Sequence, residues 1–132
     1  MKANELRVTN FVDYNGPIAV IMIGYDSVEL IETNGKTFTK KLDLIKPIPL
    51  TEDWLVRFGF VQGEQRGYFP PKFSKKYTPV LVENKFTVEF IDEHILMWLE
   101  GNTNVHMKYV HQLQNLYFAL TGTELALTGK KS

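Results

Sequence analysis

The chain has 132 residues, and its 15 lysines and arginines balance its 15 aspartates and glutamates, so the formal net charge is zero. This balance argues against a protein that coats nucleic acid nonspecifically, because such proteins usually carry a basic excess. The chain contains no cysteine, which excludes a disulfide scaffold and a cysteine-based zinc site.

The first fifty residues are expected to form a small β-barrel. Short apolar or β-branched segments between turn residues predict strands at 6–12, 18–23, 28–33, 37–42 and 44–48. Asn34-Gly35 is the strongest hairpin signal, because both residues accept the positive φ of a type I′ turn. Strands at this spacing can close on themselves, and their order over residues 5–49 resembles an SH3-like barrel.

A short helix is predicted after this barrel. Thr51 is a favoured N-cap residue, and Leu50 and Leu55 occupy the two positions of a hydrophobic staple. Gly59 is the residue type expected just past the end of a helix. These signals place the helix between Thr51 and Gly59.

The second half is expected to form an antiparallel sheet that carries a C-terminal helix. The predicted strands are 60–61, 68–69, 80–82, 86–91 and 95–99. Apolar residues at helical spacing predict a helix from about Lys108 to Thr121, which ends at Gly122. The predicted fold class is therefore α+β, mainly β, as one domain over 1–132 with subdomains 1–49 and 50–132.

Three segments resemble a family of small bacterial proteins from prophages and other mobile elements. The segment 108–122, with the sequence KYVHQLQNLYFALTG, carries the most specific similarity. Residues 4–7 with Asn10, and residues 47–52, resemble the same family. The resemblance implies a prophage or mobile-element setting, and it implies no activity because none is known for that family.

No group of residues predicts a metal site or a catalytic site. The histidines are His94, His106 and His111, and the last two lie about 140° apart around a helix, which is unlike the i, i+4 pair of a zinc site. No serine lies in a Gly-x-Ser-x-Gly elbow. We therefore predict no catalytic residue, no metal and no cofactor.

The segment 66–77 combines basic and aromatic side chains without an acid. The candidate partner-binding residues in it are Arg66, Tyr68, Lys72, Phe73, Lys75, Lys76 and Tyr77. Aromatic faces stack on bases while lysines contact phosphates, as in proteins that hold single strands. The same composition suits a protein-binding patch. The commoner alternative is that the aromatic residues belong to the core and the lysines are their solvated neighbours.

The C-terminal helix offers a second candidate surface. His111, Gln112, Gln114, Asn115 and Phe118 are predicted to lie mostly away from the apolar stripe. An exposed Phe118 beside amide side chains would suit contact with a partner or a second copy. The alternative is that a second sheet covers this face of the helix.

The missing catalytic motifs and the basic-aromatic segment favour a non-enzymatic binding or accessory module that acts through a protein surface. Nucleic-acid binding by the barrel and the same segment is the second hypothesis. An enzyme with paired carboxylates is the third, with acids near strand ends at Glu83, Glu89, Asp92, Glu93 and Glu100. The polar N-terminus lacks a secretory signal and no apolar run is long enough to span a bilayer, so a cytoplasmic protein without membrane contact is expected. The partner and the oligomeric state stay open.

Overall fold

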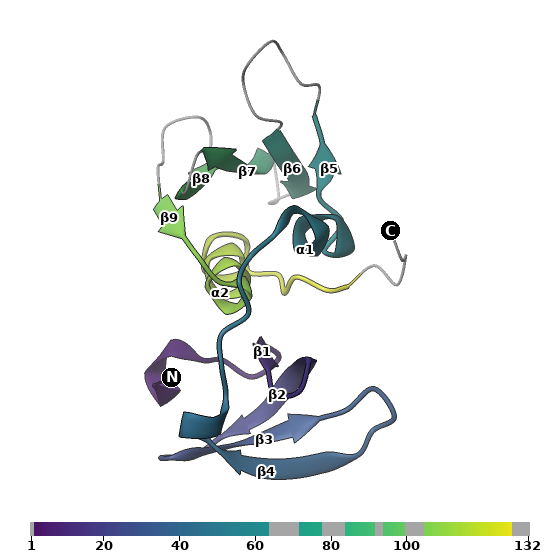
Figure 1. Ribbon diagram of the computed structural model, residues 1–132. Coiled ribbons are helices and arrows are strands. Elements are labelled where there is room, and N and C mark those ends of the chain that lie inside the picture. The colour runs from purple at the N-terminus through teal and green to yellow at the C-terminus, as the bar shows by residue number, and fades with distance from the viewer. Residues whose placement is uncertain (1, 64–71, 78–83, 92–93, 100–104, 128–132) are drawn as a thin grey trace. The chain divides into compact units, whose positions relative to one another are not determined.

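Figure 1 shows a computed structural model of the chain, which describes residues 2–63, 72–77, 84–91, 94–99 and 105–127. Over these residues the protein is α+β and mainly β, with a four-stranded and a five-stranded antiparallel sheet and two α-helices, as the fold-class prediction states. The chain divides into two compact units, Met1–Pro49 with Tyr109–Leu116, and Leu50–Lys108 with Tyr117–Ser132. No helix in the described part is long and apolar enough to cross a membrane.

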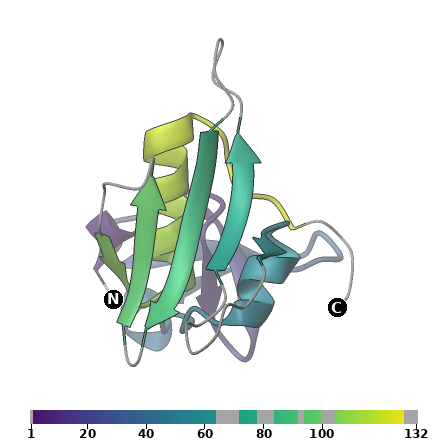
Figure 2. The same cartoon turned by 90° about the horizontal axis from the view of Figure 1, so that it is seen from above.

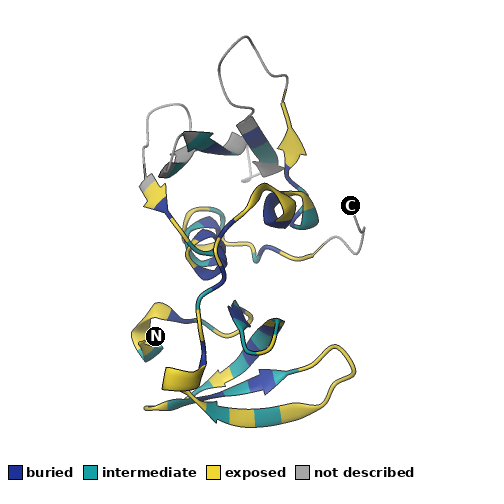
Figure 3. Cartoon of the chain, viewed as in Figure 1, coloured by how far each residue is buried: buried dark blue, intermediate teal, exposed yellow. Residues whose placement is uncertain are grey.

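The first sheet is an antiparallel meander in the order β1-β2-β3-β4. Its strands are β1 (Phe11–Asp13), β2 (Pro17–Ile23), β3 (Ser27–Ile31) and β4 (Thr37–Lys41). Buried and half-buried residues alternate along β3, as Figure 3 shows, because successive side chains point to opposite faces of a sheet. Val12, Val20 and Leu30 are completely buried and form the centre of this unit's core.

The hairpin at Asn34-Gly35 forms where the sequence predicts it, but its turn differs from type I′. Ile31 pairs with Thr37, and only Gly35 has a positive φ, of 89°. The N–H of Gly35 donates to the carbonyl of Glu32, and the N–H of Glu32 donates to that of Lys36. The connection is therefore a turn followed by one left-handed glycine, a common three-residue hairpin loop.

The fifth strand predicted at 44–48 is replaced by an isolated bridge. A 3₁₀ helix, η2 (Leu42–Leu44), follows β4. Asp13 then exchanges two backbone hydrogen bonds with Lys46, of 2.8 and 3.0 Å. Pro47 and Pro49 lack the N–H that a longer ladder needs. Over the described residues the first sheet is open, and no closed barrel is found.

The predicted short helix is confirmed as α1 (Glu52–Arg57). The hydroxyl of Thr51 accepts from the backbone N–H of Trp54 at 3.5 Å, and Gly59 has a φ of 87°. Leu50 and Leu55 are both buried, as a hydrophobic staple requires. The local signals at both ends therefore position this helix.

The second sheet has the order β5-β6-β7-β8-β9, and Figure 2 shows β6, β7 and β8 side by side. Its strands are β5 (Val61–Gln62), β6 (Lys72–Tyr77), β7 (Asn84–Ile91), β8 (His94–Leu99) and β9 (Val105–Met107). β7 and β8 lie at the predicted positions, whereas β6 and β9 lie in segments for which no strand was expected. The predicted strands 68–69 and 80–82 lie outside the described residues.

The C-terminal helix is α2 (Val110–Thr121), which confirms the prediction of a helix over 108–121. Gly122 has a φ of 73° and donates its N–H to the carbonyl of Phe118, so it ends the helix as expected. Residues of α2 up to Leu116 belong to the first unit and those from Tyr117 belong to the second. The expected subdomain 50–132 included residues 109–116. In the structure these residues belong to the first unit, with the N-terminal segment.

Candidate functional site

The basic-aromatic segment is a strand over the part that the structure describes, not a loop. Residues 72–77 form β6, which pairs with β7 along its whole length. Phe73 is 1% exposed and packs edge-on against Phe90, with ring centroids 6.2 Å apart. Phe73 is thus a core residue, and the prediction that it contacts a partner needs correction. Arg66 and Tyr68 lie outside the described residues.

Lys75 is held by the end of α1. Its Nζ donates a hydrogen bond of 3.0 Å to the carbonyl of Phe58, and the side chain is half-buried. Burial lowers the pKa of the Lys75 ammonium from its usual value. A cation at the last carbonyls of a helix also interacts favourably with the helix dipole. Lys72, Lys76 and Tyr77 share β6 with it, and their contact with a partner stays a prediction.

Three of the polar residues on α2 are buried or half-buried rather than exposed to solvent. His111 is 3% exposed and Gln114 is 1% exposed, while Asn115 is half-buried. Gln112 is exposed and Phe118 is 39% exposed. The predicted helix surface is therefore divided between buried and exposed positions.

Gln114 binds the backbone beside β1. Its Oε1 accepts from the N–H of Phe11 at 2.8 Å, and its Nε2 donates to the carbonyl of Thr9 at 3.2 Å. The amide thus makes the two hydrogen bonds with the backbone that a neighbouring strand would otherwise make at this point. Both halves of the side chain are satisfied, which explains how a polar group can be completely buried.

Asn115 joins three positions of the N-terminal segment. Its Oδ1 accepts from Arg7 Nη1 at 2.9 Å and from Asn10 Nδ2 at 2.8 Å. Its Nδ2 donates to the carbonyl of Glu5 at 3.0 Å. Asn10 is completely buried, and its Oδ1 accepts from the backbone N–H of Arg7 at 2.7 Å.

We call Arg7, Asn10, Gln114 and Asn115 the amide network. It joins two of the segments that carry the family resemblance, residues 4–10 and 108–122. Sequence analysis found each segment separately and named Gln114 and Asn115 as part of a candidate partner surface, with cover by a second sheet as the alternative. The burial of these two amides has a physical requirement: an amide that is removed from water must find hydrogen-bond partners. The N-terminal segment supplies these partners.

His111 is buried beside this network. Its ring stacks on Tyr109 with centroids 5.9 Å apart, and its Nδ1 has no hydrogen-bond partner among the described residues. Burial lowers the pKa of His111, and the Glu5 carboxylate acts in the opposite direction with a smaller effect. His106 is exposed on β9, and the described residues contain no cluster of three metal-binding side chains.

Of the five candidate carboxylates for an enzyme, Glu89 is the one that lies among the described residues. This residue lies on β7 opposite Lys72 and Leu96, and it is 7% exposed. Glu83, Asp92, Glu93 and Glu100 lie outside the described residues. A carboxylate pair at these positions therefore stays a prediction.

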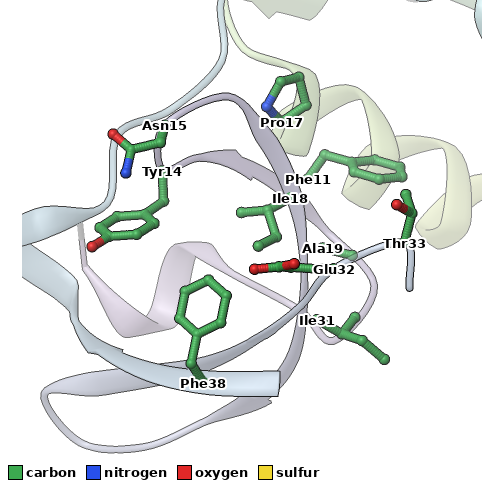
Figure 4. A pocket seen from close by; sticks show the side chains of 10 residues that line it. All are labelled: Phe11, Tyr14, Asn15, Pro17, Ile18, Ala19, Ile31, Glu32, Thr33 and Phe38. Carbon is green, nitrogen blue, oxygen red and sulfur yellow. The ribbon is translucent and has the colours of Figure 1, made fainter. Parts of the chain in front are cut away.

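A cleft of about 480 Å³ lies at one end of the first sheet. It is bounded by the β1–β2 turn at residues 14–17 and by the β3–β4 hairpin, and Figure 4 shows its side chains. Apolar groups predominate, including Phe11, Ile18 and Phe38. We call this the aromatic cleft. Gln114 fixes the backbone of Phe11, so the amide network also positions one wall of the aromatic cleft.

Two rings define one side of the aromatic cleft, and a lysine lies close to both rings. The ring centroids of Tyr14 and Phe38 are 5.8 Å apart and the rings are tilted by 52°. Lys40 Nζ lies 5.2 Å from the Tyr14 centroid and 5.9 Å from the Phe38 centroid. The register explains this grouping, because Phe38 is opposite Leu30 and Lys40 is opposite Val28, on the core face of the sheet.

Sequence analysis placed Phe38 on a strand, but it assigned no position to Tyr14 and did not group the two residues. Tyr14 follows β1 and Phe38 lies on β4, and these strands are the two edges of the sheet, so only the folding of the whole sheet brings the two rings together. A detectable signal was the lone aromatic in the Lys-rich segment 36–41. Comparison of the chain with protein-family models, with curated proteins and with solved structures finds no match.

Proposed function

We propose that the protein is a non-enzymatic binding module that engages a protein partner through the aromatic cleft. The observation that carries this proposal is the half-buried pair of Tyr14 and Phe38 at an open, mainly apolar hollow. Aromatic side chains are enriched where proteins contact one another, and concave sites with few polar groups are typical of binding sites.

The location within the first unit supports the same function. We propose that this unit is SH3-like, with residues 45–47 as a shortened closing strand, and the Asp13–Lys46 bridge supports that interpretation. The resemblance to bacterial prophage proteins supports an accessory role in the cytoplasm. In this proposal the amide network holds the wall of the aromatic cleft in place before a partner arrives, which lowers the entropic cost of binding.

The test is affinity capture from a bacterial lysate with the tagged full chain and with two variants. A partner should be retained by the wild type and lost by Tyr14→Ala, because truncation removes one aromatic wall. The matched control is Tyr25→Ala, since Tyr25 is an aromatic residue of the turn between β2 and β3 that is 99% exposed and lies outside the aromatic cleft. Equal capture by Tyr14→Ala and the wild type would contradict the proposal.

Nuclease treatment of the same lysate separates the alternative of nucleic-acid binding. Capture through the aromatic cleft should survive nuclease and change little with salt. If the retained material disappears with nuclease and falls steeply as salt rises, phosphate contacts carry the binding and the proposal is wrong.

A further inference from the structure

Two of the rings that line the aromatic cleft, Tyr14 and Phe38, already lie near a cationic side chain of the chain itself, that of Lys40. The Nζ of Lys40 lies within 6 Å of the centroids of both Tyr14 and Phe38, which is the range of a cation–π interaction. This geometry shows that this pair of rings can interact with a positively charged group. Lys40 itself is half-buried and is not among the residues that line the hollow.

The only formal charge among the lining residues is negative. Glu32 stands at the mouth of the aromatic cleft, and Figure 4 draws its carboxylate on the same side as Ile18 and Phe38. Its backbone is held by the hairpin, since its N–H donates to Lys36 and its carbonyl accepts from Gly35, at 2.8 and 2.9 Å. The carboxylate is thus presented from a fixed turn.

We propose that the aromatic cleft selects a protein segment that inserts a lysine or arginine side chain. The cationic head group would pair with Glu32 and lie against Tyr14 or Phe38, while its methylene stem packs on Ile18. Such amphipathic side chains bury their stems and keep the charge at a polar rim. This inference rests on the proposed function and names the chemistry that the same site recognises.

Lys40 then competes with the incoming cation. Two positive groups near the same pair of rings repel each other, so the lysine in the chain weakens binding of the lysine or arginine of the partner. The proposal consequently predicts opposite effects for two substitutions. Removing the negative charge at Glu32 lowers affinity, and removing the positive charge at Lys40 raises it.

The test titrates the ¹⁵N-labelled full chain with three capped pentapeptides that have leucine on both sides of the central residue. The central residue is arginine, its neutral isostere citrulline, or glutamate. The arginine peptide should shift amide signals of residues 11–19 and 31–38, and the citrulline peptide should bind about three-fold more weakly or worse. The glutamate peptide should leave those signals unchanged.

Two variants and one control sharpen the test. Glu32→Gln should weaken the arginine peptide about three-fold and leave the citrulline peptide unchanged, because only the ion pair is lost. Lys40→Met should tighten the arginine peptide and retain the bulk beside the rings. Glu29→Gln is the matched control, since Glu29 lies on β3 but does not line the aromatic cleft. The affinity of this variant for the arginine peptide should equal that of the wild type.

Three results would overturn the inference. Equal binding of the arginine and glutamate peptides would show that charge does not select the ligand, although the aromatic cleft could still bind the partner found by affinity capture. Shifts confined to other residues, or no shifts with any peptide, would show that this cleft does not take a cationic side chain. The capture experiment with Tyr14→Ala judges the binding function separately in each case.

Discussion

At the scale of single residues, two amide side chains explain how residues 5–11 are joined to α2. Gln114 and Asn115 are neighbours in sequence, and between them they bond to Glu5, Arg7, Thr9, Asn10 and Phe11. A buried amide with all its partners stabilises a fold modestly, but one left without partners is costly. The amide network therefore specifies which segment covers this face of α2.

Asn115→Ala is expected to lower the free energy of unfolding by about 2 kcal/mol, because it removes the three hydrogen bonds that Asn115 makes with Arg7 Nη1, Asn10 Nδ2 and the Glu5 carbonyl. Urea unfolding followed by tryptophan fluorescence or circular dichroism measures the change. Asn4→Ala is the control, since Asn4 is an exposed amide in the same N-terminal segment, and its effect should stay within about 0.5 kcal/mol. A similar small effect for Asn115→Ala would mean that the network adds little stability.

His111 should make stability depend on pH. Its pKa in the folded protein is lowered from the usual 6.5, so the unfolded chain binds the proton more readily. The contribution of His111 is complete above about pH 6.5 and is lost as the pH falls toward the lowered value. Urea midpoints at pH 7.5 and 5.5 should therefore differ less in His111→Gln than in the wild type. His106→Gln, at an exposed position, should retain the wild-type difference.

At the scale of elements, helix ends follow local signals while strand pairing does not. Thr51, Gly59 and Gly122 mark the ends of α1 and α2 as the sequence predicts, because capping depends on residues within one turn. β6 was missed because three of its six residues are lysines and one is a serine, so Phe73, which is buried, does not belong to a clear alternating apolar pattern. A polar strand is stabilised by the neighbours that flank it, here β5 and β7, which lie elsewhere in the sequence.

Gly122→Ala tests the end of α2. An added Cβ would meet no atom within 4 Å, so the cost comes from the backbone φ of 73° alone. We expect a loss of about 1 kcal/mol in the free energy of unfolding, measured by urea titration. Gly122→Asn should cost less, because asparagine tolerates the left-handed conformation better than alanine does. Equal losses for both variants would point to a cause other than backbone conformation.

At the scale of the whole molecule, the first unit is discontinuous in sequence. It consists of residues 1–49 and residues 109–116, which contribute the buried Val110 and Leu113 as well as the two amides. The two pieces meet at the bridge between Pro49 and Tyr109. The N-terminal segment therefore takes hydrogen-bond partners for Asn10 and for the backbone of Phe11 from the C-terminal helix.

A fragment of residues 1–49 should consequently lose most of its ordered structure, since it lacks the helix residues that accept hydrogen bonds from Asn10 and Phe11. Dispersion of the amide signals in an NMR spectrum measures this loss. A matched fragment, in which a short glycine-serine linker joins Pro49 to residues 109–122, should recover dispersed signals because the linker spans the bridged ends. A well-dispersed spectrum for residues 1–49 alone would contradict this account.

The sequence by itself determined the fold class, the hairpin at Asn34-Gly35 and both helices, because turn preference, capping and apolar periodicity act over a few residues. Only the tertiary structure decided three further features: the open first sheet, the inward direction of Gln114 and Asn115, and the aromatic cleft. The hydrogen bonds of Gln114 and Asn115 join residues 103 to 110 positions apart, and the cleft needs four strands in register. No local pattern encodes such pairings, because each depends on which distant segment removes a side chain from water.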